Sequence, residues 1–205
     1  MKWNRLIIQS VGSLGILQMT NYLVPVLVIP LLLARVGLEN YGMIVLAQGI
    51  MNFAVAITDF GLNLTGTRLI SLAKGDLGLE CTLTQKILVI KIFLLLGTFI
   101  GLVFLVKTVS PWEPYEYLIL TSYFIVIGNT LMPVWYFQGI QKMKWLALLN
   151  FLSRIFYVGA VLFFIESGED LLWVNVYNGM GWCIAAFFGW VVLFRKMQFR
   201  FEKQS

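Results

Sequence analysis

The sequence contains no histidine, and its two cysteines, Cys81 and Cys183, stand far apart. Without histidine the commonest general base and metal ligand is missing, although acidic and basic side chains leave other chemistry open. Two distant cysteines have neither the spacing of a zinc site nor the number of a disulfide framework, so we expect plain thiols. Paired carboxylates at short spacing and a glycine-rich phosphate loop are missing too. We therefore expect no enzyme, no metal site and no resident cofactor.

Charged residues are also scarce. They make up 12% of the 205 residues, whereas 60% are hydrophobic, a composition unlike that of a soluble domain. Apolar stretches of 18 or more residues recur, which favours membrane helices over the short alternating strands of a β-barrel. The net charge of +5 is spread over short segments between these stretches, so it does not indicate a nucleic-acid partner. The sequence predicts an all-α integral membrane protein.

Six apolar stretches predict six membrane-spanning helices that form a single lobe. The predicted spans cover residues 11–34, 41–68, 87–106, 117–137, 145–165 and 172–193. The first span is too long for the core of a signal peptide and lacks a small-residue cleavage pattern, so we retain it as a membrane helix. It contains Pro25 and Pro30, which predict a kink.

The positions of the cations predict the orientation in the membrane. If both termini are cytoplasmic, the segments on the outer side hold only Arg35 and Lys107 among the cations. The segments on the inner side then hold Lys2, Arg5, Arg68, Lys74, Lys86, Lys142, Lys144, Arg195, Lys196, Arg200 and Lys203. This asymmetry agrees with the excess of lysine and arginine found in cytoplasmic loops. We therefore expect both termini in the cytoplasm.

The second predicted span carries a polar stripe. At about 100° per residue, its polar side chains project within roughly 60° of one another. They are Gln48, Asn52, Asp59 and Asn63. A carboxylate such as that of Asp59 is costly in hydrocarbon, so it usually faces a bundle interior or a water-filled cavity. Two interpretations stay open: the stripe lines a hydrophilic cavity, or it is a seam of hydrogen bonds between helices.

The fifth predicted span holds a second deep charge, Arg154. Ten residues separate it from Lys144, which is about 15 Å of helix and reaches the middle of a hydrocarbon core roughly 30 Å thick. A guanidinium at that depth either pairs with a carboxylate, for which Asp59 is the deep candidate, or is free for an anionic ligand. Asn150 lies on the same helix face.

A lysine and several glycines in the second and third spans are interpreted as structural features. Lys91 lies one turn inside the third span, so we expect its ammonium to reach the interface by snorkelling. The spacing Gly97-x-x-x-Gly101 predicts close helix packing. Gly61 and Gly66 loosen the helix at the inner end of the second span. The alignment of polar side chains on one face is therefore expected only as far as Asp59.

Three segments resemble the O-antigen and lipid-linked oligosaccharide flippases of the polysaccharide transporter family. They are YLVPVLVIPLLLARVGLENYG (22–42), TDFGLNLTGTR (58–68) and WYFQGIQKMKWLALLNFLSRIFY (135–157). The resemblance implies a transporter of two six-helix lobes that alternately opens a central cation-lined cavity to either side of the bacterial inner membrane. This chain resembles the N-terminal lobe, with the second lobe absent, as in a truncated reading frame or a separately encoded half.

The substrate implied by the resemblance is an oligosaccharide linked to undecaprenyl diphosphate. Arginine grips phosphate oxygens bidentately, so Arg154 is the first candidate for the diphosphate, followed by Arg35 and Arg68. Neutral polar groups suit sugar hydroxyls, and the candidates are Gln48, Asn52, Asn63 and Asn150. Asp59 either balances Arg154 in the empty site or binds a coupling H⁺ or Na⁺. The lipid tail can stay in the membrane lipid between helices.

Two other functions are compatible with the residues. The first is export of cationic drugs, for which Asp59 rather than Arg154 is the anchor. The second is a non-transporting role, in which the chain docks to another membrane protein. The partners we expect are the lipid-linked oligosaccharide and membrane lipid, together with either a second lobe or a homo-oligomer.

Overall fold

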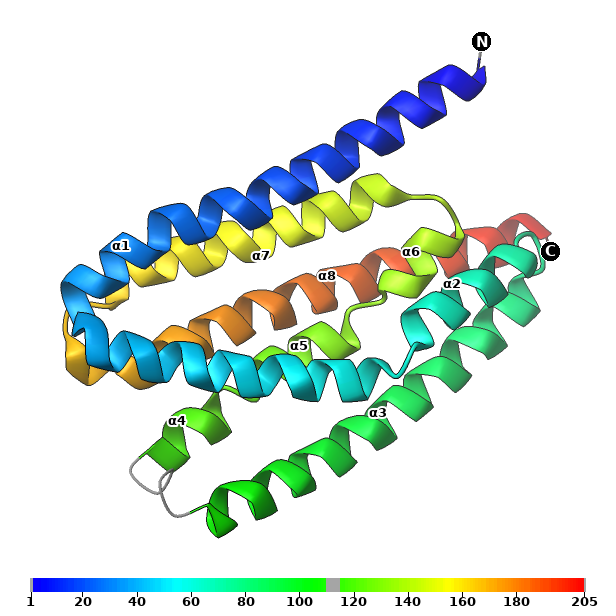
Figure 1. Ribbon diagram of the computed structural model, residues 1–205. Coiled ribbons are helices and arrows are strands. Elements are labelled where there is room, and N and C mark those ends of the chain that lie inside the picture. The colour runs from blue at the N-terminus through cyan, green and yellow to red at the C-terminus, as the bar shows by residue number, and fades with distance from the viewer. Residues whose placement is uncertain (1, 110–114, 205) are drawn as a thin grey trace.

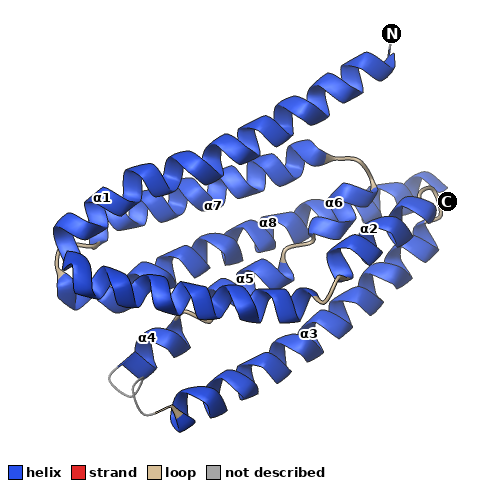
Figure 2. Ribbon diagram, viewed as in Figure 1, coloured by secondary structure: helices blue, strands red, loops and turns tan. Residues whose placement is uncertain are grey.

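The computed structural model describes residues 2–109 and 115–204. Across these two ranges the regular structure is helical, with no strand (Figures 1 and 2). In chain order the elements are α1 (Lys2–Asp59), α2 (Leu62–Leu72), α3 (Leu77–Thr108), α4 (Glu116–Thr121), α5 (Phe124–Leu131), α6 (Val134–Gly139), α7 (Met143–Phe164), the 3₁₀-helix η2 (Gly168–Asp170) and α8 (Leu171–Gln204).

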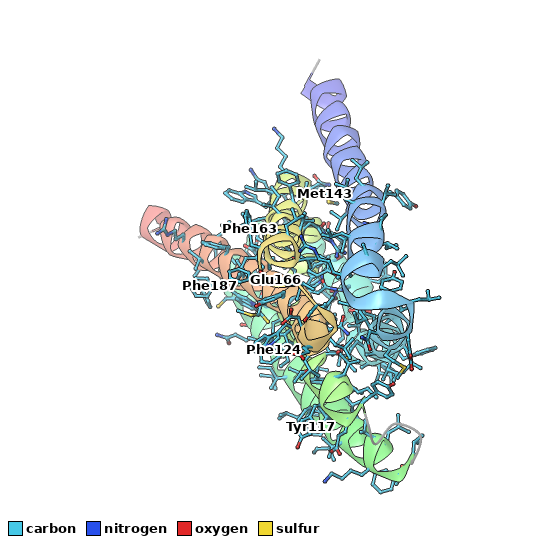
Figure 3. The ribbon with its side chains drawn as sticks, turned by 90° about the vertical axis from the view of Figure 1, so that its left-hand side faces the viewer. Tyr117, Phe124, Met143, Phe163, Glu166 and Phe187 are labelled. Carbon is cyan, nitrogen blue, oxygen red and sulfur yellow. The ribbon has the colours of Figure 1, made fainter. Side chains whose placement is uncertain are left out.

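Five helical stretches in the described part of the chain are long and apolar enough to cross a membrane. They are Tyr22–Leu72, Leu77–Thr108, Glu116–Gly139, Met143–Phe164 and Gly168–Arg195. Large apolar side chains project outward from them, among them Tyr117, Phe163 and Phe187 (Figure 3). In water such a surface would be an association hazard, whereas hydrocarbon chains solvate it without cost. The chain is therefore an all-α, multi-pass membrane protein, as the sequence predicts.

The first stretch is a helix that turns back on itself. Within α1 only Gly37 has non-helical dihedral angles, with φ 82° and ψ 166°. A positive φ is accessible to glycine at little cost, so this residue can reverse the chain. Two arms result, residues 2–36 and 38–59; the first lies beside α7 and the second returns across the molecule (Figure 1). The predicted spans 11–34 and 41–68 begin on these two arms.

The predicted span 41–68 is interrupted. Helix α1 ends at Asp59, Phe60 and Gly61 have φ values of 40° and 75°, and α2 starts at Leu62. The expectation of one continuous helix was wrong at this point, because Gly61 accepts the left-handed conformation that stops a helix. The loosening expected at Gly61 is confirmed, whereas Gly66 is buried inside α2.

The predicted span 117–137 is also broken, into α4, α5 and α6. The break that matters here lies between α5 and α6, where Met132 is extended with ψ 122° and Pro133 follows. A proline disfavours the helical conformation in the residue before it, so α5 ends at Leu131. Trp190 of α8 donates its indole N–H to the Leu131 carbonyl at 2.8 Å. This hydrogen bond satisfies a carbonyl group that the break would otherwise leave free.

Glycines bring α5 and α8 together at a distance that other residues do not permit. A Cβ added at Gly128 would lie 2.5 Å from the backbone nitrogen of Cys183, and one added at Gly179 would lie 2.5 Å from Phe124. The expected packing at Gly97 and Gly101 was wrong, because a Cβ at either position would meet nothing within 4 Å. Small residues permit close contact between helices, but the neighbouring helix must also run along that face. Both cysteines are free thiols.

Candidate functional site

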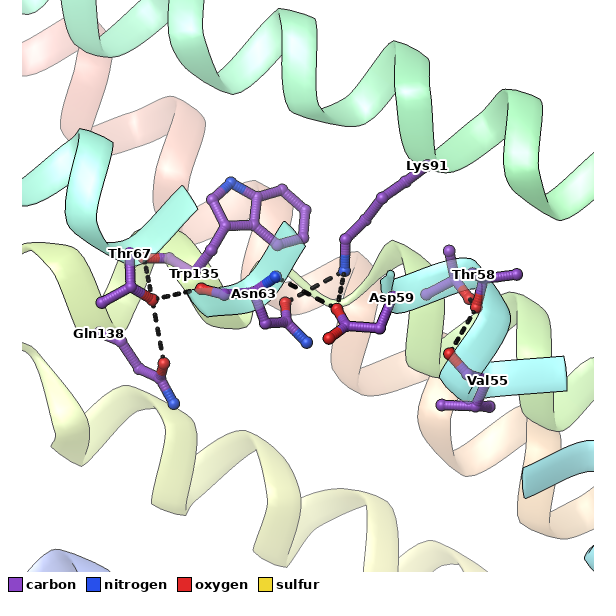
Figure 4. A network of polar contacts seen from close by, with 9 residues as sticks. Val55, Thr58, Asp59, Asn63, Thr67, Lys91, Trp135 and Gln138 are labelled. Carbon is purple, nitrogen blue, oxygen red and sulfur yellow. Dashed lines mark hydrogen bonds and ion pairs between the residues drawn. The ribbon is translucent and has the colours of Figure 1, made fainter. Parts of the chain in front are cut away.

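An ion pair lies inside the bundle where α1 ends. The ammonium Nζ of Lys91 is 3.2 Å from Oδ1 of Asp59 (Figure 4). The side chain of Lys91 is 1% exposed and that of Asp59 is 31% exposed. The expectation that Lys91 snorkels to the interface was therefore wrong.

Lys91 lies well inside α3. The Asp76 carboxylate accepts the backbone N–H of Leu79 at 3.0 Å and caps the helix, so α3 begins at Leu77. Lys91 follows about 21 Å further along the helix axis, too far for its side chain to reach that end. A lysine at this depth requires a carboxylate or polar partners, and Asp59 supplies the carboxylate.

The break after Asp59 shapes the other side of the pair. Asp59 accepts the backbone N–H of Asn63, in the first turn of α2, at 3.2 Å. Asn63 in turn accepts a hydrogen bond from Lys91 at its Oδ1, at 3.1 Å. The chain turn at Phe60 and Gly61 thus places a carboxylate and an amide oxygen around one ammonium group. Both acceptors come from the predicted polar stripe.

The second helix break contributes a tryptophan and a glutamine. Nζ of Lys91 lies 4.5 Å from the ring centre of Trp135, which follows Pro133 at the start of α6, within the range of a cation–π contact. Thr67 of α2 donates its hydroxyl to Oε1 of Gln138 at 3.0 Å. The cluster therefore links α1, α2, α3 and α6 (Figure 4). The indole nitrogen of Trp135 is buried and has no hydrogen-bond partner among the described residues.

Arg154 lies in a different part of the bundle, between α7 and α8. Its guanidinium carbon is 5.3 Å from the ring centre of Trp182. Within the described ranges no ion pair joins it to Asp59, which pairs with Lys91 instead. Of the two alternatives left open for Arg154, the pair with Asp59 is therefore not formed. The Nε of Arg154 and the Oδ1 of Asn150 are both buried and lack a hydrogen-bond partner in the part of the chain that the structure describes.

The remaining predicted site residues have separate positions. Gln48 donates to Oδ1 of the buried Asn175 at 2.8 Å, and Asn175 donates to Ser122 at 2.8 Å. Asn52 and Arg68 are exposed on the outside of the helices. The polar stripe is thus divided: Gln48 bonds to α8, Asp59 and Asn63 bond to α3, and Asn52 points away from both.

Arg35 is used as a structural cap. Its guanidinium Nη1 donates to the carbonyl groups of Val161, Leu162 and Ile165 at 3.0, 2.9 and 2.6 Å. These carbonyls belong to the C-terminal end of α7, where the helix leaves acceptors without partners and where the macrodipole favours a cation. Arg35 therefore fastens the first arm of α1 to α7 beside the turn at Gly37.

Sequence reasoning missed three members of these networks: Lys91 as a buried cation, Trp135 and Asn175. Lys91 could have been found by reading Asp76 as a helix cap, because the helix then starts at Leu77 and Lys91 lies in its middle. Trp135 lies near the end of the predicted span 117–137, where the sequence gives no sign that its side chain is fully buried. Nothing in the local sequence indicates Asn175 as the partner of Gln48.

The fold and the site define a class: a multi-pass helical membrane protein with a charge pair buried where two of its spans are broken. Such interruptions are tolerated at membrane depth where protein or a water-filled cavity surrounds them, and they recur at the binding sites of transporters. The described residues contain no group of three or more acidic, cysteine or histidine side chains that could hold a metal ion.

The chain belongs to the polysaccharide biosynthesis protein family, whose model matches residues 7–205. It is 30% identical over 163 residues to a protein of Escherichia coli strain K12 named "Putative O-antigen transporter", a match covering 80% of this chain and 39% of that protein. A protein of the same name from Shigella dysenteriae is 25% identical over 154 residues, covering 74% of this chain and 38% of that protein. No solved structure shows a significant match.

These comparisons confirm the resemblance to the polysaccharide transporter family. The chain spans about two fifths of the length of the curated relatives it matches. Since the relatives named here are bacterial and the chain is multi-pass and helical, its location is the membrane, typically the inner membrane in bacteria.

Proposed function

We propose that this chain acts in flipping a lipid-linked oligosaccharide, an undecaprenyl-diphosphate saccharide, across the bacterial inner membrane. In this proposal it forms one lobe of six membrane crossings with both termini cytoplasmic, since each arm of α1 counts as a crossing. The second lobe is supplied by another segment or chain, or by a second copy. The observation that carries the proposal is the ion pair of Lys91 and Asp59 at the meeting point of two helix breaks.

The diphosphate and Asp59 compete for the same cation. While the site is empty, Asp59 neutralises Lys91 and allows it to stay buried. Diphosphate oxygens replace the carboxylate at Lys91, and the displaced Asp59, which is 31% exposed, is then free to bind the coupling H⁺ or Na⁺. Binding of the substrate and of the coupling ion are then linked, because each is favoured when the other is present.

Arg154, in a different part of the bundle, is proposed as a second cation that binds phosphate. Its buried Nε has no hydrogen-bond partner among the described residues, and neither has the Oδ1 of Asn150 one turn away. Leaving a buried donor and acceptor unsatisfied costs about 1–3 kcal/mol each. A phosphate oxygen on Nε and a sugar hydroxyl on Oδ1 would remove that cost, so substrate binding here is favoured by groups that are already in place.

Export of cationic drugs is less well supported by this geometry. A drug cation would have to reach Asp59, and the ammonium of Lys91 already lies 3.2 Å from that carboxylate. Two cations at one carboxylate in a low-dielectric site repel each other strongly. A free anchor for a cation is therefore lacking at Asp59.

The test is complementation of a strain that lacks its lipid-linked oligosaccharide flippase, with surface polysaccharide as the readout. The chain is expressed alone and together with a separately expressed second lobe. Restoration by the chain alone indicates self-assembly into a transporter, and restoration only with the second lobe indicates a half-transporter. If the chain is present in the membrane and neither combination restores polysaccharide, the proposal is wrong.

Substitutions at Arg154 sharpen the test. We expect Arg154→Ala to reduce surface polysaccharide at least tenfold in the working combination, and Arg154→Lys to retain part of it, because lysine keeps the charge but lacks the planar fork. Lys107→Ala, which removes an exposed cation at the end of α3, is the matched control. An unchanged polysaccharide level in Arg154→Ala at equal protein amount would remove Arg154 from the site.

A further inference from the structure

Arg154 carries an uncompensated charge between α7 and α8. Its Nε is buried without a hydrogen-bond partner among the described residues, and no described carboxylate forms an ion pair with it. A guanidinium inside a membrane protein is costly unless another group stabilises it. The described part of the chain offers this charge an aromatic face instead, because the ring centre of Trp182 lies 5.3 Å from the guanidinium carbon.

Two close helix contacts fix the backbone that carries Trp182. A Cβ added at Gly128 of α5 would lie 2.6 Å from the Cβ of Trp182, so α8 is pressed against α5 at this residue. One residue earlier in α8, a Cβ added at Gly181 would lie 2.7 Å from the carbonyl oxygen of Ser153 in α7. Arg154 and Trp182 each directly follow a residue of this α7–α8 contact. The backbone at Trp182 therefore cannot move away from Arg154 without opening both contacts.

An aromatic ring and a carboxylate hold an arginine in different ways. A carboxylate accepts hydrogen bonds from the N–H groups of the guanidinium and neutralises its charge. An aromatic ring attracts the cation through its π face and leaves the charge uncompensated. Arg154 therefore keeps its charge, and its Nε–H has no acceptor within the described ranges. A receptor for an anion needs such a cation in place before the ligand arrives.

Lys91 is held differently, although it also lies near a tryptophan. Its Nζ is 4.5 Å from the ring centre of Trp135, but Asp59 pairs with the ammonium at 3.2 Å. An anion at Lys91 must therefore displace a carboxylate. At Arg154 an anion meets no such competitor among the described residues. The aromatic contact at Arg154 thus takes the place that a carboxylate has at Lys91.

We propose that Trp182 is a positioning residue for the binding of phosphate by Arg154. This inference rests on the proposed function and names the residue that keeps one of its two cations ready. The indole of Trp182 holds the guanidinium through the cation–π contact. A phosphate of the lipid-linked substrate accepts hydrogen bonds from the N–H groups of Arg154, so Trp182 acts through Arg154 and not through the phosphate.

A double-mutant cycle tests this role by ligand binding, without requiring transport. The full chain is purified in detergent, and its affinity for farnesyl diphosphate, a short lipid diphosphate, is measured by isothermal titration calorimetry. We expect Trp182→Leu to weaken this affinity about fivefold, as the loss of a cation–π contact should. In an Arg154→Ala background the same substitution should have no further effect, because Trp182 acts through Arg154.

Further variants separate the cation–π contact from packing. Fluorinated tryptophans at position 182 keep the shape of the indole but withdraw electrons from its face, so the affinity should fall with each added fluorine. Trp182→Phe should retain part of the affinity, because it keeps an aromatic face. Trp173→Leu is the control that should bind as the wild type does, since it removes an exposed tryptophan from the same helix. Thermal unfolding checks that every variant is folded.

Several outcomes would overturn the proposal. Wild-type affinity in Trp182→Leu would do so, and so would equal losses in the wild-type and Arg154→Ala backgrounds, which indicate a general effect on packing. An affinity that does not respond to fluorination would mean that the shape of the ring alone matters. Wild-type affinity in Arg154→Ala would remove Arg154 from the phosphate site, and this role of Trp182 with it. The proposed function fails separately, since the expected cycle without complementation would leave the role of Trp182 standing.

Discussion

A buried lysine determines what its neighbours can be. Lys91 needs an anion in reach, and Asp59 supplies one while remaining partly accessible itself. The two residues are therefore unequal: Asp59 is 31% exposed, whereas Lys91 is 1% exposed and enclosed by Asn63 and Trp135. Removal of the carboxylate should be the more damaging change.

This inequality predicts the outcome of a double-mutant cycle. We expect Asp59→Asn to destabilise the protein by about 3–5 kcal/mol, the cost of breaking a buried pair by removal of one partner, and Lys91→Met to cost less. The double variant should be more stable than Asp59→Asn alone, because no unpaired charge remains. Thermal unfolding in detergent measures the effect, and one kcal/mol corresponds to a shift of about 2–4 °C in Tm for a chain of this size. Additive effects of the two substitutions would contradict a direct pair.

For single residues, the sequence predicted which charged side chains lie inside the membrane spans. It did not predict which of them contact one another. Asp59 and Arg154 were recognised from the cost of a charge in hydrocarbon, which depends on the sequence alone. Whether the two residues pair stayed open because it depends on which helices are neighbours, and in the structure Asp59 pairs with Lys91 instead. The position of Lys91 was misjudged because hydropathy does not show which way a side chain turns: it is buried against Asp59 and Asn63 instead of reaching the interface.

At the scale of elements, the helix breaks at Phe60–Gly61 and Met132–Pro133 show two ways of providing partners for backbone groups that a break leaves free. Each frees backbone groups inside the bundle, and each has a partner nearby: Asp59 accepts an N–H of α2, and Trp190 donates to the last residue of α5. Helices α5 and α8 are held together by contacts that leave no room for an added Cβ. Of these, the contact of α5 with α8 at Gly128 is among the tightest.

The tight contact predicts a large effect from one methyl group. In Gly128→Ala the new Cβ would meet the backbone of Trp182 and Cys183, which cannot rotate away, so we expect a loss of about 1–3 kcal/mol. In Gly159→Ala the Cβ meets nothing within 4 Å, and the substitution should be neutral or stabilise α7 by about 0.5–1 kcal/mol. Comparison of the two Tm values in detergent measures the difference. Equal values would mean that α5 and α8 can separate at no cost.

The positions of helices could be predicted wherever a long apolar stretch marks a membrane-spanning helix. The arms of α1, α7 and the apolar part of α8 lie where the apolar stretches indicate helices, and the turn near Gly37 follows from a short polar segment between two such stretches. The breaks were harder to predict. Gly61 and Pro133 are visible in the sequence, but glycine and proline also occur inside continuous membrane helices, as Pro25 and Pro30 do in α1.

At the scale of the whole molecule, the proposed orientation has a direct consequence for the loops. With both termini in the cytoplasm, the turn between α2 and α3, which contains Lys74, lies inside, and the segment at η2, which contains Glu166, lies outside. Lys74 and Glu166 are both exposed in the structure, so a thiol placed at either site is accessible to a reagent.

Cysteine labelling tests this orientation. In a Cys81→Ser, Cys183→Ser background, we expect Glu166→Cys to react with a membrane-impermeant maleimide in intact cells. We expect Lys74→Cys to react only after the inner membrane is permeabilised. The amount of labelled protein on a gel is the measurement, and the two positions serve as each other's control. The reverse pattern would show that the excess of cations lies outside and that the termini are not cytoplasmic.

The three hydrogen bonds of Arg35 have a mechanical consequence. Separating the first arm of α1 from α7 beside Gly37 would break all three hydrogen bonds of Arg35. The carbonyl groups of Leu162 and Ile165 would then lose this donor, whereas Val161 would keep its bond to the N–H of Ile165. The three hydrogen bonds therefore hold these two helices together at this end. The contact of α1 with α7 is thus held at one end by Arg35, whereas the face of α3 at Gly97 and Gly101 has open space beside it.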